Sequence, residues 1–275
     1  MTTITAHVVA DSVGHLAPRL TTMLLRYPLI IHAELMTHRV FSRNAASSRA
    51  IPFKKMLQSV TDDPFVPLVW TKNEPGMQGY EELEGGKRSH AEWAWTQALN
   101  AATHWARVMV ETGVHKQIVN RLLAPFAHIT VLVTSTEWDN WFQLRDHEKA
   151  EPHIRILAKA MRTALDTSTP KLLMPGEWHL PYIGLEVDRS VIAPLIRKSV
   201  ACCASVSYRT VDGFEMTQER ADRIYRELVG SKPLHASPSE HQAQVEDDPS
   251  LGHLRGNLAQ GWVQVRKLLE VGLVF

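Results

Sequence analysis

The chain has 275 residues, 44% of them hydrophobic, with 30 Lys and Arg against 29 Asp and Glu and a formal net charge of +1. Proteins that bind duplex DNA usually carry a basic excess that neutralises phosphates. The charge balance therefore excludes a nucleic-acid surface and confines any anion site to a local arginine cluster. The hydrophobic content suffices for a core, and the length allows one large domain or two small ones.

The cysteines and the N-terminus exclude further classes. Cys202 and Cys203 are adjacent and cannot close a disulfide framework, and no ligand spacing typical of structural zinc appears. The N-terminus lacks the pattern of a signal peptide, and no run of about 18 apolar residues predicts a membrane span. We therefore expect a cytoplasmic protein without a membrane or metal partner.

The N-terminal third begins with short strands, expected at 4–10 and 20–25. Pro28 can start a helix over Leu29–His38, which a polar stretch over 39–52 follows. Prolines and glycines are frequent in 62–90 and indicate a long surface excursion.

The middle of the chain is mostly helical. Apolar residues recur at threes and fours over 91–112, which predicts a helix that Gly113 ends. A short helix is expected at 115–123 and a buried strand at 129–133. Ser135 or Thr136 can cap a helix that runs to Arg145, and Pro152 can open another that runs to about Leu165.

The C-terminal third begins with a Pro-rich extended segment at 167–184. Helices are expected at 190–199, 217–229 and 262–270, with a loop over 246–261. Short strands interleaved with helices predict an α/β or α+β single domain, with a mixed or antiparallel sheet flanked by helices.

The segment Glu34–Arg49 carries the strongest chemical signal. Glu34 and His38 share a helical face, and the arginines and small polar residues that follow are suited to an oxyanion cradle. The alternative is a solvated basic loop. The following residues are Arg39, Ser42, Arg43, Asn44, Ser47, Ser48 and Arg49.

Two further clusters stand out less. Arg121, Asn140 and Arg145 lie on predicted helices, where a C-terminal arginine often only complements the helix dipole. The segment HASPSEH, from His235 to His241, contains imidazoles and a carboxylate. We favour a helix start capped by Ser237 with Glu240 as its capping-box partner over a metal site.

The stretch THRVFSRNAASSR, Thr37 to Arg49, resembles the signature of flavin-dependent thymidylate synthases. That signature is Arg-His-Arg, seven residues, then Ser, and His38, Arg39 and Ser47 match it. Asn44 and Arg49 also fall on positions typical of the family.

The other clusters resemble the same family. Arg121 before Pro125 matches one motif, and Asn140, Leu144 and Arg145 match another. The segment ACCASVSY, the helix from Thr217 and HASPSEH resemble the family's N-terminal run, but here they follow the signature. We infer a circular permutation within a single domain over 1–275, with the family's N-terminal part at 199–241 and a surface insertion at 62–90.

The resemblance implies an enzyme that binds FAD and a pyrimidine deoxynucleoside monophosphate. It implies that methylenetetrahydrofolate supplies one carbon, that NADPH reduces the flavin, and that a homotetramer shares its active sites between subunits. The implied flavin contacts are His38, Arg39, Asn44, Asn140, Lys149, Ser207, His235, Ser237 and Glu240.

The resemblance also implies a nucleotide site. The arginines there would stabilise negative charge on the pyrimidine, so Arg145 and Arg49 are the expected catalytic residues together with Ser47, which acts as a binder. The full set is Glu34, Ser47, Ser48, Arg49, Arg121 and Arg145.

Several residues depart from the family pattern. Thr37 replaces an Arg, Ala45 a Glu, Lys149 a His, and Glu34 a Gln. A carboxylate only accepts hydrogen bonds, so Glu34 would suit a cytosine amino group, unless Lys149 or an Arg neutralises it. Thymidylate synthesis from dUMP is the default expectation. The alternatives are hydroxymethylation of dCMP and a nucleotide-binding protein without turnover.

Overall fold

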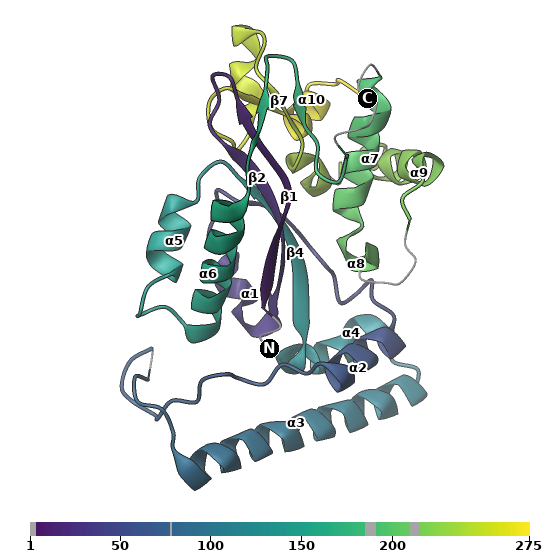
Figure 1. Cartoon of the computed structure of the whole chain (residues 1–275). Helices are drawn as coiled ribbons and strands as arrows, with labels where there is room; N and C mark the ends of the chain where they lie inside the picture. The colour runs from purple at the N-terminus through teal and green to yellow at the C-terminus, as the bar shows by residue number, and fades with distance from the viewer. Residues whose placement is uncertain (1–3, 78, 185–190, 210–214) are drawn as a thin grey trace.

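The computed structural model describes residues 4–77, 79–184, 191–209 and 215–275 (Figure 1). They form two β-sheets with helices around them, which confirms the predicted mixed α/β class. Within the described residues, no helix combines the length and the hydrophobicity that a membrane crossing requires.

The larger sheet has five strands in the order β3-β4-β2-β1-β5. All neighbours are antiparallel except β1 and β5, which run parallel, so the sheet is mixed. Most residues of the central strands β2 and β4 are buried, because other elements pack on both faces of the sheet. The strands are β1 (Thr5–Gly14), β2 (Leu20–Pro28), β3 (Ser42–Ala45), β4 (His128–Ser135) and β5 (Lys171–Leu173).

One face of this sheet packs against α5 (Asp139–Arg145) and α6 (Pro152–Thr167), which lie side by side in Figure 1. Met23 and Val131 point toward this face, where Trp141 and Ile154 meet them in the main hydrophobic core. Leu24 and Leu132, one residue further along each strand, point to the other face and pack near α8 (Val206–Arg209). The core therefore fixes the register that positions β3 and its following loop.

The smaller sheet joins β6 (Trp178–His179), β7 (Ala243–Val245) and β8 (Trp262–Gln264), all antiparallel. It shares a hydrophobic cluster with three helices: α7 (Ile192–Ala204), α9 (Gln218–Val229) and α10 (Val265–Glu270).

A chain of buried hydrogen bonds joins the two sheets. The His179 ring bonds Ser12 Oγ and Thr22 Oγ1, both at 2.9 Å, and Thr22 bonds Thr134 at 2.7 Å. Thr134 in turn bonds His241 Nδ1 at 2.8 Å. Burial lowers the pKa of both histidines to about 3, so they are neutral. His241 thereby anchors the HASPSEH segment to β4.

Three helices form the base of the molecule (Figure 1): α2 (Phe53–Asp62), α3 (Gly85–Glu111) and α4 (Lys116–Leu122). They share a small hydrophobic cluster around Met56 and Val119. The remaining short helices are α1 (His32–Leu35) and the 3-10 turns η1 (Leu29–Ile31), η2 (Ala124–Phe126), η3 (Ser237–Glu240) and η4 (Pro249–Arg255).

Several sequence expectations need correction. The long helix begins at Gly85, six residues before the expected start. Ser135 does not cap α5, because its Oγ accepts a hydrogen bond from Glu137 N in a turn and the helix begins only at Asp139. The tail at 246–261 contains η4, and residues 262–264 form a strand.

The predicted capping box at Ser237 is wrong. The segment forms a 3-10 turn whose N-cap is Ala236, without a side-chain cap. The Ser237 hydroxyl bonds Asn44 Oδ1 instead, and the Glu240 carboxylate pairs with Arg266. Tertiary contacts have therefore taken both side chains that the local pattern assigned to capping.

Candidate active site

Side chains that bond its backbone N–H and C=O groups hold the loop that follows β3 in place. Ser47 N donates to Ser207 Oγ at 2.9 Å, and Ser47 Oγ accepts from Arg49 N at 3.3 Å. The buried Asn120 amide donates to the carbonyls of Ser48, at 2.7 Å, and Ile51, at 3.0 Å. Asn120 was not among the predicted site residues, because an asparagine next to Arg121 gives no sequence signal of burial.

This loop borders a cavity of about 330 Å³, here named the serine–arginine cavity. Its Arg49 and Arg121 are exposed, and no described carboxylate pairs with either guanidinium. Two uncompensated cations beside two serines suit a small, doubly charged anion such as a phosphate. The lining residues are Leu29, His32, Ala45, Ala46, Ser47, Ser48, Arg49, Ile51, Met56, Arg121, His128 and Ile129.

Asn44 joins three segments that are far apart in sequence. Its Nδ2 donates to the Cys203 carbonyl at 2.5 Å, and its Oδ1 accepts from the Ser237 hydroxyl at 3.3 Å. With the Ser47–Ser207 bond, these contacts bring together Asn44, Ser207 and Ser237, three of the nine residues that the resemblance implies for a flavin. The segments ACCASVSY and HASPSEH thus lie beside β3 and the loop that follows it.

A second group, here named the Arg145 cluster, consists of Glu34, Thr37, His38 and Arg145. The Arg145 guanidinium donates to His38 Nε2 and Glu34 Oε2, both at 3.1 Å, and to Thr37 Oγ1 at 3.3 Å. Thr37, which replaces the first Arg of the signature, therefore acts as an acceptor for Arg145. All three acceptors lie on or just after α1.

His38 is a buried, neutral member of this cluster. Only 6% of it is exposed, and its ring lies 4.7 Å from that of Trp141. Burial, followed by the charges of Arg145 and Arg43, lowers the pKa of His38 below its ordinary value. Because Nε2 accepts from Arg145, the ring proton is on Nδ1.

Glu34 forms an ion pair with Arg145, with 38% of its side chain exposed. Burial raises the pKa of Glu34, and the Arg145 charge opposes that shift. Arg145 is therefore the arginine that neutralises Glu34, the alternative that the sequence left open.

The ion pair faces a second cavity, of about 780 Å³. Part of its wall comes from the predicted surface excursion, and Lys149 also lines it. The lining residues are Glu34, Val69, Thr71, Pro75, Gly76, Met77, Gly79, Tyr80, Leu144, Arg145, Glu148, Lys149, Ala150, Glu151, Pro152 and His153.

Other predicted residues lie apart from the serine–arginine cavity and the Arg145 cluster. Arg39, Asn140 and His235 are exposed, and within the described residues no hydrogen bond joins their side chains to either group. Glu240 is ion-paired with Arg266 and is thus compensated within the chain. Among the described residues, no three His, Cys, Asp or Glu side chains are grouped to hold a metal.

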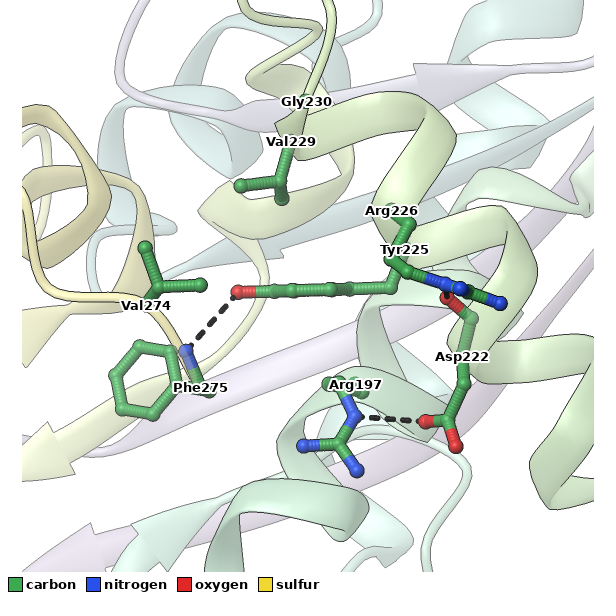
Figure 2. A pocket seen from close by; sticks show the side chains of 8 residues that line it. All are labelled: Arg197, Asp222, Tyr225, Arg226, Val229, Gly230, Val274 and Phe275. Atoms are coloured by element: carbon green, nitrogen blue, oxygen red, sulfur yellow. Dashed lines mark hydrogen bonds and ion pairs between the residues drawn. The ribbon is translucent and has the colours of Figure 1, made fainter.

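A third cavity, of about 620 Å³, lies between α7, α9 and the last residues (Figure 2). Tyr225 and Phe275 line it, and Arg197 pairs with Asp222 at 2.6 Å on its rim. None of the predicted site residues lines it.

Comparisons with known proteins agree with the signature. A family model described as "Thymidylate synthase complementing protein" (Thy1) matches residues 18–171, more than half of the chain and both arginine groups. No protein with a curated description matches the sequence significantly.

Solved structures of a UMP/dUMP methylase, PolB from Streptomyces cacaoi, are similar in fold. The complex with 5-Br dUMP has a TM-score of 0.51 at 18% identity, covering 63% of this chain and 92% of that one. The complex with 5-Br UMP has a TM-score of 0.49 at 18% identity, covering 63% and 91%. The chain belongs to the Thy1 family, the flavin-dependent thymidylate synthases, and is a methyltransferase-type enzyme of that family.

Proposed function

We propose that the chain transfers a one-carbon unit from methylenetetrahydrofolate to C5 of dUMP, with NADPH as reductant and FAD as cofactor. The products are dTMP, tetrahydrofolate and NADP⁺. The observation that carries this proposal is the serine–arginine cavity, where no carboxylate of the described residues pairs with Arg49 or Arg121 beside Ser47 and Ser48. This is the charge pattern that a nucleotide phosphate requires.

The junction at Asn44 fits one polar edge of a flavin. Ser237 is exposed there, and Ser207 is half-buried beside the signature loop. Arg39 and His235 add exposed donors suited to the pyrophosphate, whereas the pairing of Glu240 with Arg266 weakens its assignment. A flavin bound at this junction supplies the electron transfer, and the residues of the chain bind and orient the reactants.

Arg145 and Lys149 would act from the second cavity. Because Arg145 and Arg49 line different cavities of one chain, we assign them to active sites that two subunits complete together, as the expected homotetramer requires. Arg145 would then stabilise negative charge on the base while Arg49 and Arg121 hold the phosphate.

The permuted order is part of the proposal. The bonds from Asn44 and Ser47 to Cys203, Ser207 and Ser237 support 199–241 as the family's N-terminal part. The wall that the excursion forms beside Arg145 supports its assignment as an insertion at the site.

A direct test uses purified protein reconstituted with FAD. It should be yellow, bleach anaerobically with NADPH, and convert dUMP with methylenetetrahydrofolate to a product heavier by one methylene unit in mass spectrometry. Failure of the protein to take up FAD would contradict the proposed enzyme activity. Nucleotide binding without turnover would then be the remaining function.

The same assay separates the two bases. Because Arg145 neutralises Glu34, we expect turnover of dUMP to exceed that of dCMP. The variant Glu34→Gln, which restores the amide usual in the family, should preserve turnover of dUMP. A hydroxymethylated product from dCMP, lost in Glu34→Gln, would instead establish the alternative substrate.

A further inference from the structure

The third cavity, here named the α7–α9 cavity, has an apolar end and a charged end. Figure 2 shows Val274 and Phe275 at the hydroxyl end of the Tyr225 ring, with Asp222 and Arg226 near its other end. A volume of about 620 Å³ is within the range of pockets that enclose small organic molecules. The lining residues are Arg197, Asp222, Tyr225, Arg226, Val229, Gly230, Val274 and Phe275.

The apolar end offers a fixed aromatic surface. Tyr225 is only 2% exposed, and its hydroxyl oxygen accepts a hydrogen bond from Phe275 N at 3.4 Å. Burial raises the pKa of Tyr225, so the phenol stays protonated and brings no charge to the cavity. Val274 is 71% exposed beside it, and an apolar ligand would remove part of that surface from water.

The charged end has one cation more than its anions. Arg197 Nε donates to Asp222 Oδ1 at 2.6 Å, and this bond is the main cause that holds the pKa of Asp222 below its ordinary value. The ionised Asp222 thus compensates Arg197. Arg226 donates through Nε to the backbone carbonyl of Asp222 at 3.3 Å, and no carboxylate of the described residues pairs with it. The lining side chains therefore carry one net positive charge.

This charge pattern selects a different anion from that of the serine–arginine cavity. There, two uncompensated guanidiniums and two serines suit a phosphate, whereas the α7–α9 cavity is lined by one uncompensated guanidinium and no serine, threonine or amide side chain. A carboxylate has two oxygens, and one guanidinium can bind both. A phosphate would keep further oxygens without a donor. The cavity therefore suits a single carboxylate attached to an apolar body.

We propose that the α7–α9 cavity binds a small aromatic monocarboxylate that acts as an effector of the active site. The apolar body of the ligand lies against Tyr225 and Val274, and its carboxylate pairs with Arg226. Binding at this cavity is independent of the proposed activity, whereas the effector role rests on the proposed function.

The effector role follows from where the two helices of the cavity lead. Near the end of α7, the Cys203 carbonyl accepts a hydrogen bond from Asn44. Beyond α9, His235 N donates to the Leu228 carbonyl at 3.3 Å, and Ser237 donates to Asn44 at the same distance. Both walls of the cavity thus continue into partners of Asn44, on the signature segment. A ligand that favours one spacing of α7 and α9 would bias the position of these partners.

The first test titrates the full chain with hydrocinnamate in a calorimeter. We expect a dissociation constant below about 1 mM, and at least about tenfold weaker binding of hydrocinnamide, which has the same shape without the charge. Arg226→Gln should weaken hydrocinnamate binding by a similar factor. The matched control is Arg223→Gln, an exposed arginine of the same helix outside the cavity, which should bind like the unmodified chain.

A second pair of variants tests the apolar end. Val274→Glu places a carboxylate there and should weaken hydrocinnamate binding at least about tenfold, whereas Val274→Gln should weaken it less. The exposure of Val274 makes both substitutions compatible with folding, which circular dichroism checks. Absence of hydrocinnamate binding, unchanged affinity in both Arg226→Gln and Val274→Glu, or tighter binding of phenyl phosphate than of hydrocinnamate overturns the proposed ligand.

The last test measures the effector role. Saturating hydrocinnamate should change the dissociation constant of dUMP at least about fivefold, and Val274→Glu should abolish this change. An unchanged constant overturns the effector role. The titration with dUMP alone tests the proposed function separately. If dUMP does not bind, the proposed function fails, while the hydrocinnamate titrations still decide whether the α7–α9 cavity is a binding site.

Discussion

The two arginine groups of the site differ in how their charge is compensated. In the serine–arginine cavity, Arg49 and Arg121 are exposed and no described carboxylate pairs with them. In the Arg145 cluster, one guanidinium has three acceptors, and one of them is the carboxylate of Glu34. Arginine of the first kind is available to an anionic ligand, whereas arginine of the second kind already has its counter-charge.

Within the proposed function, this difference assigns phosphate binding to the serine–arginine cavity and catalysis to the Arg145 cluster. Net positive charge at the serine–arginine cavity would provide affinity for the phosphate. Arg145 is pre-oriented by His38 and Thr37, and such a fixed donor is most effective where charge develops during reaction. Mutation of the two groups should therefore affect different kinetic constants.

The largest effect is expected from removing both uncompensated cations. A hydrogen bond to a charged group contributes about 1.5–3 kcal/mol. The variant Arg49→Ala/Arg121→Ala should therefore weaken dUMP binding about 100-fold or more, measured by calorimetry at fixed salt.

Its control is Arg107→Ala, which removes an exposed guanidinium of α3 outside both cavities. This variant should bind dUMP like the unmodified enzyme. If the double variant also keeps its affinity, the phosphate does not occupy the serine–arginine cavity and the comparison between the two groups fails.

The sequence predicted the residue types of the serine–arginine cavity and of the Arg145 cluster. It did not predict that the two groups of arginines line different cavities. Arg49, Arg121 and Arg145 were expected around one nucleotide, on its phosphate and base, because a motif records spacing along the chain and not which cavity a side chain faces. The ion pair of Arg145 with Glu34 depends on how α5 packs against the sheet beside α1. No local pattern encodes that packing.

The fold was predictable where periodicity is strong. The buried strand β4 and the helix α6, which begins at Pro152, lie close to their expected ranges. The prediction failed where a tertiary partner replaced a local one. Ser237 and Glu240 have the spacing of a capping box, but Asn44 and Arg266, both distant in sequence, bind their side chains.

A smaller effect, and on turnover, is expected from Arg145. Arg145→Ala should lower kcat about 100-fold, the range for loss of one donor at a developing charge, while dUMP affinity falls less than about tenfold. Steady-state kinetics and calorimetry separate the two constants. Because Arg145→Ala leaves the Glu34 carboxylate unpaired, Arg145→Ala/Glu34→Gln is the matched variant that removes the pair together. Equal losses of affinity in this variant and in Arg49→Ala/Arg121→Ala would show that Arg145 also binds the phosphate.

The smallest effect is expected at His38. The protonation state of its ring shows whether the hydrogen bond from Arg145 is formed. Its pKa is lower in the folded chain than in the unfolded one, so the unfolded chain takes up the proton first as pH falls. The free energy of unfolding that His38 contributes is fully present above the unfolded value of about 6.5, and below it declines by at most about 1.4 kcal/mol per pH unit. Urea unfolding between pH 7 and pH 5 should therefore depend less on pH in His38→Gln, whose amide oxygen still accepts from Arg145. Nitrogen NMR of the unmodified chain at pH 7 should show a proton on Nδ1 alone. A doubly protonated ring at that pH would mean that Arg145 does not donate to His38, and the cluster would then be as open to a ligand as the serine–arginine cavity.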